Sequence, residues 1–224
     1  MRARLFKAIE GGEGEEVRNL LSVDADLALA RNAEGASALI WAAYYRQPAI
    51  CELLMHHGAR PDIFEASALN LNDRVKELLH ADPTLVAGYS FDGWTPLHLA
   101  AHFGSLEVLR TLLANGARHQ AVSRNNNGNQ PLQAAAAGRQ AETVAILLQV
   151  GADVDAPSEG GFTALHVAAA NGDMEMARML LEAGATIEMR TMGGKTPLEL
   201  ATESNHEEVV AILEAAKEEQ KNNA

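Results

Sequence analysis

The sequence predicts an all-α solenoid of stacked helix-turn-helix units joined by hairpins or turns, and three observations lead to this prediction. Residues 93–104, GWTPLHLAAHFG, and residues 161–172, GFTALHVAAANG, are two copies of one pattern. A Gly-Ala pair follows each copy at the same distance. A pair of large aliphatic residues recurs at steps of 33, 25, 34, 35, 33 and 32 residues, and the pairs begin at Leu20, Leu53, Leu78, Leu112, Leu147, Leu180 and Ile212.

One unit contains the signals for two short helices and a connection. Thr95 is a good N-cap and Pro96 suits the first helical position, so a helix is expected to start there. Gly104 is placed to end this helix in a left-handed conformation. A second helix carries the aliphatic pair and ends at Gly116. Residues 118–128 then form the turn or hairpin that reaches the next unit.

This pattern resembles the ankyrin repeat, whose consensus is Gly-x-Thr-Pro-Leu-His-x-Ala-Ala followed by Gly, Leu-Leu and Gly-Ala. Residues 93–117 match the consensus throughout, and the resemblance covers residues 5–216. It implies an ankyrin-repeat solenoid of about seven units. Several copies depart from the consensus, with Ala38, Ile40 and Arg46 in the second unit, Gln130, Gln133 and an early Gly138 in the fifth, Ala164 in the sixth, and Glu199 and Asn205 in the seventh.

The resemblance implies one array over residues 1–216, in which the first and last units act as polar caps. The third unit is shortened, and Leu78 is expected to lie in its core. A frayed tail is expected over residues 217–224. The predicted units are residues 4–31, 32–62, 63–89, 90–122, 123–156, 157–189 and 190–216.

Composition limits the possible partners and locations. The chain has 224 residues, a net charge of −12 and 47% hydrophobic residues, which is typical of a folded protein that does not bind nucleic acid or an anionic membrane. No apolar segment follows Arg2 and Arg4, so we expect no signal peptide, and no segment is apolar enough to span a bilayer. The single cysteine, Cys51, fits a reducing compartment. We therefore expect a cytoplasmic protein, and the family implies a monomer.

The residues that suggest chemistry each have a structural interpretation beside the functional one. His98 and His166 suit a base or a metal ligand, but in the family this histidine bonds the turn backbone and ties neighbouring units. His98 and His102 have the spacing of a zinc pair, but no further ligand lies nearby in the sequence. Cys51 lies in a helix without a base beside it, so we expect it to pack in the core. The sequence therefore predicts no catalytic residue, no cofactor and no metal site.

The resemblance implies that a partner binds to the hairpin tips and to the exposed side of the first helix of each unit. Eight aromatic residues lie between Trp41 and Phe103, and aromatic side chains contribute much of the energy of protein interfaces. Units two to four are therefore the predicted binding patch, although bulky side chains could instead fill a packing defect beside the short third unit. The candidate residues are Tyr44, Tyr45, Asn70, Phe91, Asp92, Trp94, His102, Phe103, Asn126, Asn129 and Phe162.

The predicted function is a non-catalytic adaptor that binds another protein through its concave face. One alternative is a bacterial or archaeal effector or immunity-type inhibitor, which would use the same surface against a single target. A second alternative is an engineered binding scaffold, but the shortened unit and the drifted consensus positions favour a natural protein. A third alternative is an enzyme, which needs converging polar groups that this spacing does not provide.

Overall fold

The chain folds as a stack of helix pairs, and the computed structural model describes residues 1–222. Within these residues there are fourteen α-helices and two 3-10 helices, and the only bridge outside them joins Arg31 to Ser37. Consecutive helices pair into units one to seven. The helices are α1 (Arg2–Glu10), α2 (Gly14–Val23), η1 (Ala25–Leu29), α3 (Ala38–Tyr44), α4 (Pro48–His56), α5 (Ile63–Ala68), α6 (Asn72–Ala81), η2 (Pro83–Ala87), α7 (Pro96–Phe103), α8 (Leu106–Ala114), α9 (Pro131–Ala137), α10 (Ala141–Gln149), α11 (Ala164–Asn171), α12 (Met174–Glu182), α13 (Pro197–Glu203) and α14 (Glu207–Asn222).

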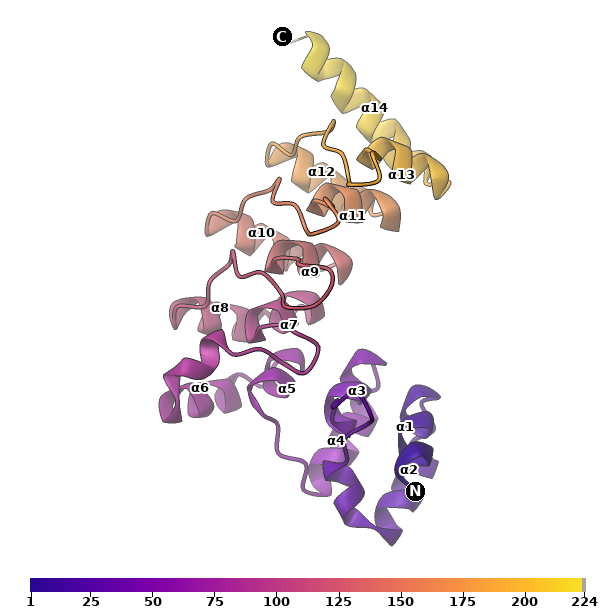
Figure 1. Ribbon diagram of the computed structural model, residues 1–224, viewed down its shortest axis with the longest axis vertical. Helices are drawn as coiled ribbons and strands as arrows, with labels where there is room; N and C mark the ends of the chain where they lie inside the picture. Colours follow the sequence, from indigo (N-terminus) through magenta and orange to yellow (C-terminus); the bar gives the residue numbers. More distant parts are fainter. Residues whose placement is uncertain (223–224) are drawn as a thin grey trace.

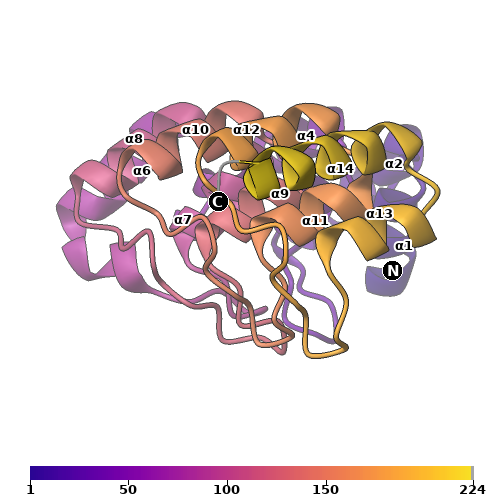
Figure 2. The same ribbon diagram turned by 90° about the horizontal axis from the view of Figure 1, so that it is seen from above.

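The units form three layers. Figure 2 shows the second helices of the units along one side, the first helices beneath them, and the connecting loops projecting from the opposite side. Figure 1 shows that the stack also changes direction at α5 and α6. The helices α1 to α4 lie beside one another at the bottom of that view, whereas the units from α7 to α14 follow one another upward.

The first helices begin as the sequence predicts. The Thr95 side chain accepts a hydrogen bond from the His98 backbone, and Pro96 occupies the first position of α7. Thr163 caps α11 through His166 in the same way. Such a cap stabilises a helix by about 1 kcal/mol, so it fixes where each first helix starts.

The turn between the two helices of a unit needs one residue in the left-handed region. Gly104 fills this place with a φ of 71°. Where the glycine is missing, Arg46, Asn70 and Asn205 adopt positive φ values instead. Unit five shows that the early Gly138 is not a shifted copy of this glycine. Gly138 is right-handed, with a φ of −76°, and the next residue has the φ of 60°.

The left-handed residue of unit five is Arg139. A side chain in this conformation costs about 1–2 kcal/mol relative to the right-handed one. Its Nη2 donates a hydrogen bond of 2.6 Å to the carbonyl of Asn171, at the end of α11. The side chain therefore links unit five to unit six, which offsets part of that cost.

The interior is divided into two apolar cores. One core runs from Ile63 to Leu213 along units three to seven. The other begins at Leu5, extends through units one and two, and also includes Ala68 of α5 and Leu99 of α7. The two cores therefore meet at unit three, the shortened unit.

The core position of unit three differs from the prediction. Leu78 is only partly buried at the edge of the core, whereas Leu79 is 4% exposed and lies within it. The physical reason is the rotation of α6 about its axis, because adjacent helical residues point about 100° apart and only one of the two leucines can face the core. Unit two makes the same choice, since Leu54 is fully buried and Leu53 only partly so.

Unit three also has no hairpin of its own. In unit four, the backbone N–H of Ser90 donates to the carbonyl of Trp94 at 2.8 Å and closes a hairpin before α7. Between α4 and α5 only residues 57–62 connect the helices. The hairpins of units two and four therefore have no third hairpin between them.

The last helix extends into the segment for which the sequence predicts a frayed tail, residues 217–224. The helix α14 continues through Asn222. Residues 215–220 are good helix formers, and Lys217 Nζ lies 2.6 Å from Glu188 Oε1 in an ion pair. Residues 223–224 lie outside the described part of the chain.

Candidate protein-binding surface

In units four, five and six, the residue three positions after the helix N-cap links its unit to the next one. His98 is fully buried, and its Nδ1 lies 2.7 Å from Thr95 Oγ1. His166 has the same arrangement, and Gln133 takes this place in unit five. The structural interpretation of the two histidines is therefore confirmed. The links to the next hairpin are His98 Nε2 to Asn129 O at 2.9 Å, Gln133 Nε2 to Ala156 O at 2.6 Å, and His166 Nε2 to Lys195 O at 3.1 Å.

The buried His98 predicts a pH-dependent stability. Burial lowers the pKa of His98 from its ordinary 6.5 to about 4. Between these values the unfolded chain binds the extra proton, so stability falls as the pH falls from 6.5 to 4, by at most about 1.4 kcal/mol per pH unit. Urea unfolding of the wild type between pH 4 and 7.5 measures this slope.

The matched control for this prediction is His98→Gln, since Gln133 makes the same link in unit five. We expect the variant to fold and to lose stability less steeply over the same pH range. Because both proteins carry the same carboxylates, their difference isolates the histidine. Equal slopes in the two proteins would contradict the assigned pKa.

Aromatic side chains of units two and four contact one another across the short unit three. Tyr44 and Phe103 lie 5.4 Å apart between ring centroids, Phe103 contacts His102 at 5.1 Å, and His102 contacts Trp94 at 5.1 Å. The hydroxyl of Tyr44 donates to Asp92 in the hairpin of unit four. We call Tyr44, Tyr45, Phe91, Trp94, His102 and Phe103 the aromatic surface.

Members of the aromatic surface differ in accessibility. Tyr45 and Phe91 are 43% and 40% exposed, whereas Tyr44 is half-buried. Burial, together with Asp92, raises the pKa of Tyr44, so its hydroxyl stays a donor. Burial also lowers the pKa of His102, whose ring is therefore neutral near pH 7. Tyr44 thus packs two units together, and Tyr45 and Phe91 are the side chains available to a partner.

The other candidate residues lie elsewhere. Asn70 forms the turn after α5, and its Oδ1 accepts from the backbone of Val108 at 3.4 Å. Asn129 is 8% exposed, so it supports its hairpin and is not available at a tip. Asn126 and Phe162 are exposed and line a separate pocket of about 290 Å³ between units five and six.

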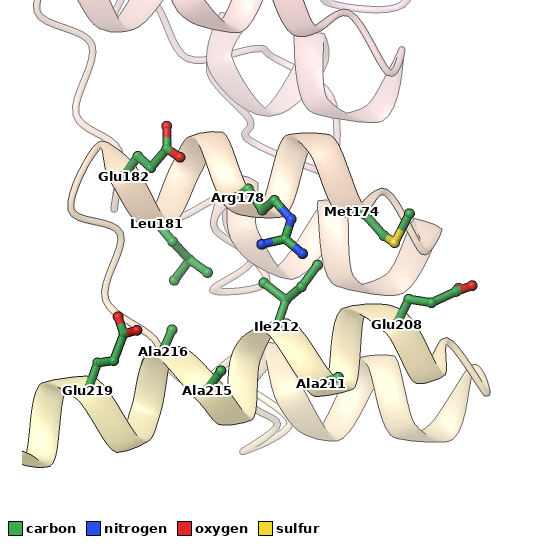
Figure 3. A pocket seen from close by; sticks show the side chains of 10 residues that line it. All are labelled: Met174, Arg178, Leu181, Glu182, Glu208, Ala211, Ile212, Ala215, Ala216 and Glu219. Atoms are coloured by element: carbon green, nitrogen blue, oxygen red, sulfur yellow. The ribbon is translucent and has the colours of Figure 1, made fainter.

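Two further hollows were not predicted from the sequence. One is a cavity of about 210 Å³ at the missing hairpin, lined by residues of units two, three and four. Its sequence signal is the pair Ile40 and Glu65, which stand where other units have His98 or Gln133. The other is a groove of about 510 Å³ between α12 and α14, with Leu181 and Ile212 along it (Figure 3).

The described residues contain no group of three or more His, Cys, Asp or Glu side chains placed to hold a metal ion. Cys51 is buried, and burial raises the pKa of its thiol to about 11, so it is a packing residue. In the same part of the chain, no helix combines the length and apolar character needed to cross a membrane.

Stacked helix pairs with linked hairpins define a helical-repeat protein. A family model for three ankyrin repeats matches residues 63–158 and 156–223, and a model for a single ankyrin repeat matches residues 34–66. Together they cover most of the chain, which belongs to the ankyrin repeat family. Ankyrin repeats are generally protein–protein interaction modules and are typically non-catalytic.

Three relatives share parts of this array. The chain is 36% identical over 105 residues to "Ankyrin repeat and SAM domain-containing protein 6" of Rattus norvegicus, covering 47% of this chain and 12% of the relative. It is 37% identical over 98 residues to "E3 ubiquitin-protein ligase XB3" of Oryza sativa subsp. japonica, covering 43% and 21%. It is 32% identical over 166 residues to "Putative ankyrin repeat protein FPV014" of Fowlpox virus, covering 70% and 37%. The chain thus spans 12% to 37% of these relatives.

Proposed function

We propose that the chain is a non-catalytic module that binds another protein through its concave face, at the aromatic surface of units two to four. The observation that carries this proposal is the network of Tyr44, Phe103, His102 and Trp94 in contact with one another. The neighbouring residues Tyr45, which packs on Trp41, and Phe91 are exposed. Aromatic anchors surrounded by polar residues are typical of the energetic centres of interfaces.

A structural role and a binding role coexist in this surface. Tyr44 bonds Asp92 and contacts Phe103, so truncating it would disturb the junction of units two and four. Tyr45 and Phe91 are better positions for a test because each exposes about two fifths of its surface. A cytoplasmic location and a monomeric state remain predictions of the sequence.

The experiment is quantitative affinity capture from a lysate of the organism that carries the gene. Wild type is compared with the double variant Tyr45→Ala/Phe91→Ala and with Val150→Ala. Val150 is a control because it is 43% exposed at the end of α10, away from the aromatic surface. We expect a protein that wild type and the control retain and the double variant loses, with binding weakened about 30-fold or more for a hot spot of about 2 kcal/mol.

Two results would contradict the proposal. A partner retained equally by all three proteins would move the binding site away from the aromatic surface, with Asn126 and Phe162 as the next positions to test. Failure of wild type to retain any protein reproducibly would remove the protein-binding function. Circular dichroism of each variant is needed beside the capture, so that loss of binding is not loss of fold.

A further inference from the structure

The cavity at the missing hairpin is enclosed by three units. Its walls come from Ser37 and Tyr44 of unit two, Asp62 and Glu65 of unit three, and Asp92 of unit four. Glu65 occupies the capping position of unit three, but a carboxylate cannot donate to a carbonyl of the next hairpin as His98 and Gln133 do. The Oε2 of Glu65 accepts from the backbone of Asp62 at 2.8 Å, and its Oε1 accepts from Ser37 of the preceding unit.

Three carboxylates line this cavity, and neutral donors hold them. Asp62 accepts from the backbone N–H groups of Phe64 and Glu65, and Asp92 accepts from the hydroxyls of Ser90 and Tyr44. None of the three carboxylates forms an ion pair within the described residues. Glu65 is only 6% exposed, and a buried acid without a cation carries a large desolvation penalty.

One cationic side chain, Arg31, also lines the cavity. Its Nη1 donates to the carbonyl of Gly35 at 2.8 Å, within its own hairpin. Burial raises the pKa of Glu65 more than Arg31 lowers it, so this arginine does not compensate the buried acid. The carboxylates thus outnumber the cations of the cavity by three to one.

The remaining walls suit a flat cation. The rings of Tyr44, Phe64 and Phe91 line the cavity beside the carboxylates. A guanidinium stacks on aromatic faces and offers several donors in one plane, whereas an ammonium is a compact, strongly hydrated charge. The chain already holds one such contact at the edge of this region, since the guanidinium carbon of Arg124 lies 3.8 Å from the centroid of the Tyr89 ring.

We propose that this cavity receives an arginine side chain of the partner protein, between the carboxylates of Glu65 and Asp92 and the neighbouring aromatic rings. The inference rests on the proposed protein-binding function and adds the chemistry of the partner. Phe91 belongs to both the cavity and the aromatic surface, so one partner segment reaches both sites. A metal ion is the weaker choice because no metal-holding group is found among residues 1–222.

The test uses N-acetyl-arginine methylamide as a probe and follows the backbone amide resonances of the folded protein by NMR. The cavity variant is Glu65→Gln/Asp92→Asn, which keeps an acceptor at each position. Unit five supports the first change, because Gln133 Oε1 accepts from its own capping backbone at 2.8 Å. The control variant is Asp26→Asn/Glu107→Gln, which makes the same change in net charge at exposed positions outside the cavity.

We expect saturable shifts around Ser37, Glu65 and Asp92 for wild type and the control, and at least tenfold weaker binding to the cavity variant. The matching citrulline derivative should not bind. Equal binding to all three proteins, shifts outside the cavity, equal binding of citrulline, or tighter binding of the lysine derivative would each overturn the inference.

The captured partner separates this inference from the proposed function. A partner that the cavity variant retains with wild-type affinity would overturn the arginine assignment and leave the protein-binding function intact. If wild type retains no partner, the proposed protein-binding function is wrong. The proposal that the cavity receives a partner's arginine is then wrong as well, even if the probe binds. We expect the partner to be retained by the control variant and weakened at least tenfold by the cavity variant.

Discussion

Replacing Leu79 with alanine is expected to destabilise the protein by about 2–5 kcal/mol, the usual cost of removing a buried leucine side chain. Leu79 is 4% exposed and belongs to the core of units three to seven. The side chains around Leu79 lie on short helices that are held in place by the neighbouring units. They therefore cannot move far enough to fill the cavity that the alanine leaves. Urea unfolding, followed by circular dichroism, measures the change.

The matched variant is Leu78→Ala, one residue earlier on α6. Leu78 is only partly buried, so its truncation removes less apolar surface from the core and is expected to cost about 1 kcal/mol. Equal losses for the two variants, or a larger loss for Leu78→Ala, would show that α6 presents the other leucine to the core.

Replacing Gly138 with alanine is expected to cost about 3 kcal/mol, near the upper end of the range for overpacking. Gly138 has a φ of −76°, which any residue adopts, so the backbone conformation does not require glycine. Space does, because a Cβ at this position would lie 2.0 Å from the carbonyl oxygen of His102. The end of α7 and the end of α9 must therefore move apart to admit the methyl group.

Gly14→Ala is the control for this prediction. Gly14 is the first residue of α2, has no positive φ, and a Cβ built there meets nothing within 4 Å. We expect no loss of stability, since alanine also restricts the unfolded chain. Thermal unfolding of both variants measures the contrast. A Gly138→Ala protein as stable as Gly14→Ala would mean that units four and five do not approach closely at this point.

Much of the fold follows from the sequence because each unit carries its own local signals. Thr95 and Pro96 start a helix and Gly104 ends it, and neither event depends on distant contacts. The environments of Gly138 and Leu78 do not follow from local signals. The space beside Gly138 is limited by the His102 carbonyl of the preceding unit, and the packing of α6 against its neighbours places Leu79 in the core and leaves Leu78 at its edge.

The candidate site was less accessible to sequence reasoning. The aromatic residues were found because they cluster in the sequence, and the structure brings Tyr44, Phe103 and Trp94 into one network through His102. Asn129, which the sequence places at a tip, is buried, and its side chain accepts a hydrogen bond from Ser123 within the same hairpin. The cavity at Glu65 exists because unit three lacks a hairpin. Its walls include residues of units two and four, which are not adjacent in the sequence, so no local sequence pattern predicts it.

The division of the interior into two cores has a mechanical consequence. Stacked repeats are stabilised by terms between neighbours, so the array is as rigid as its weakest contact between units. That contact lies at α5, where Ala68 belongs to the core of units one and two, Ala66 belongs to the other core, and Phe64 packs against both. Bending is expected to concentrate there. A ligand that contacts both sides of this junction binds only one bend angle of the array. A substitution that holds the junction at that angle is therefore expected to increase the affinity for the ligand.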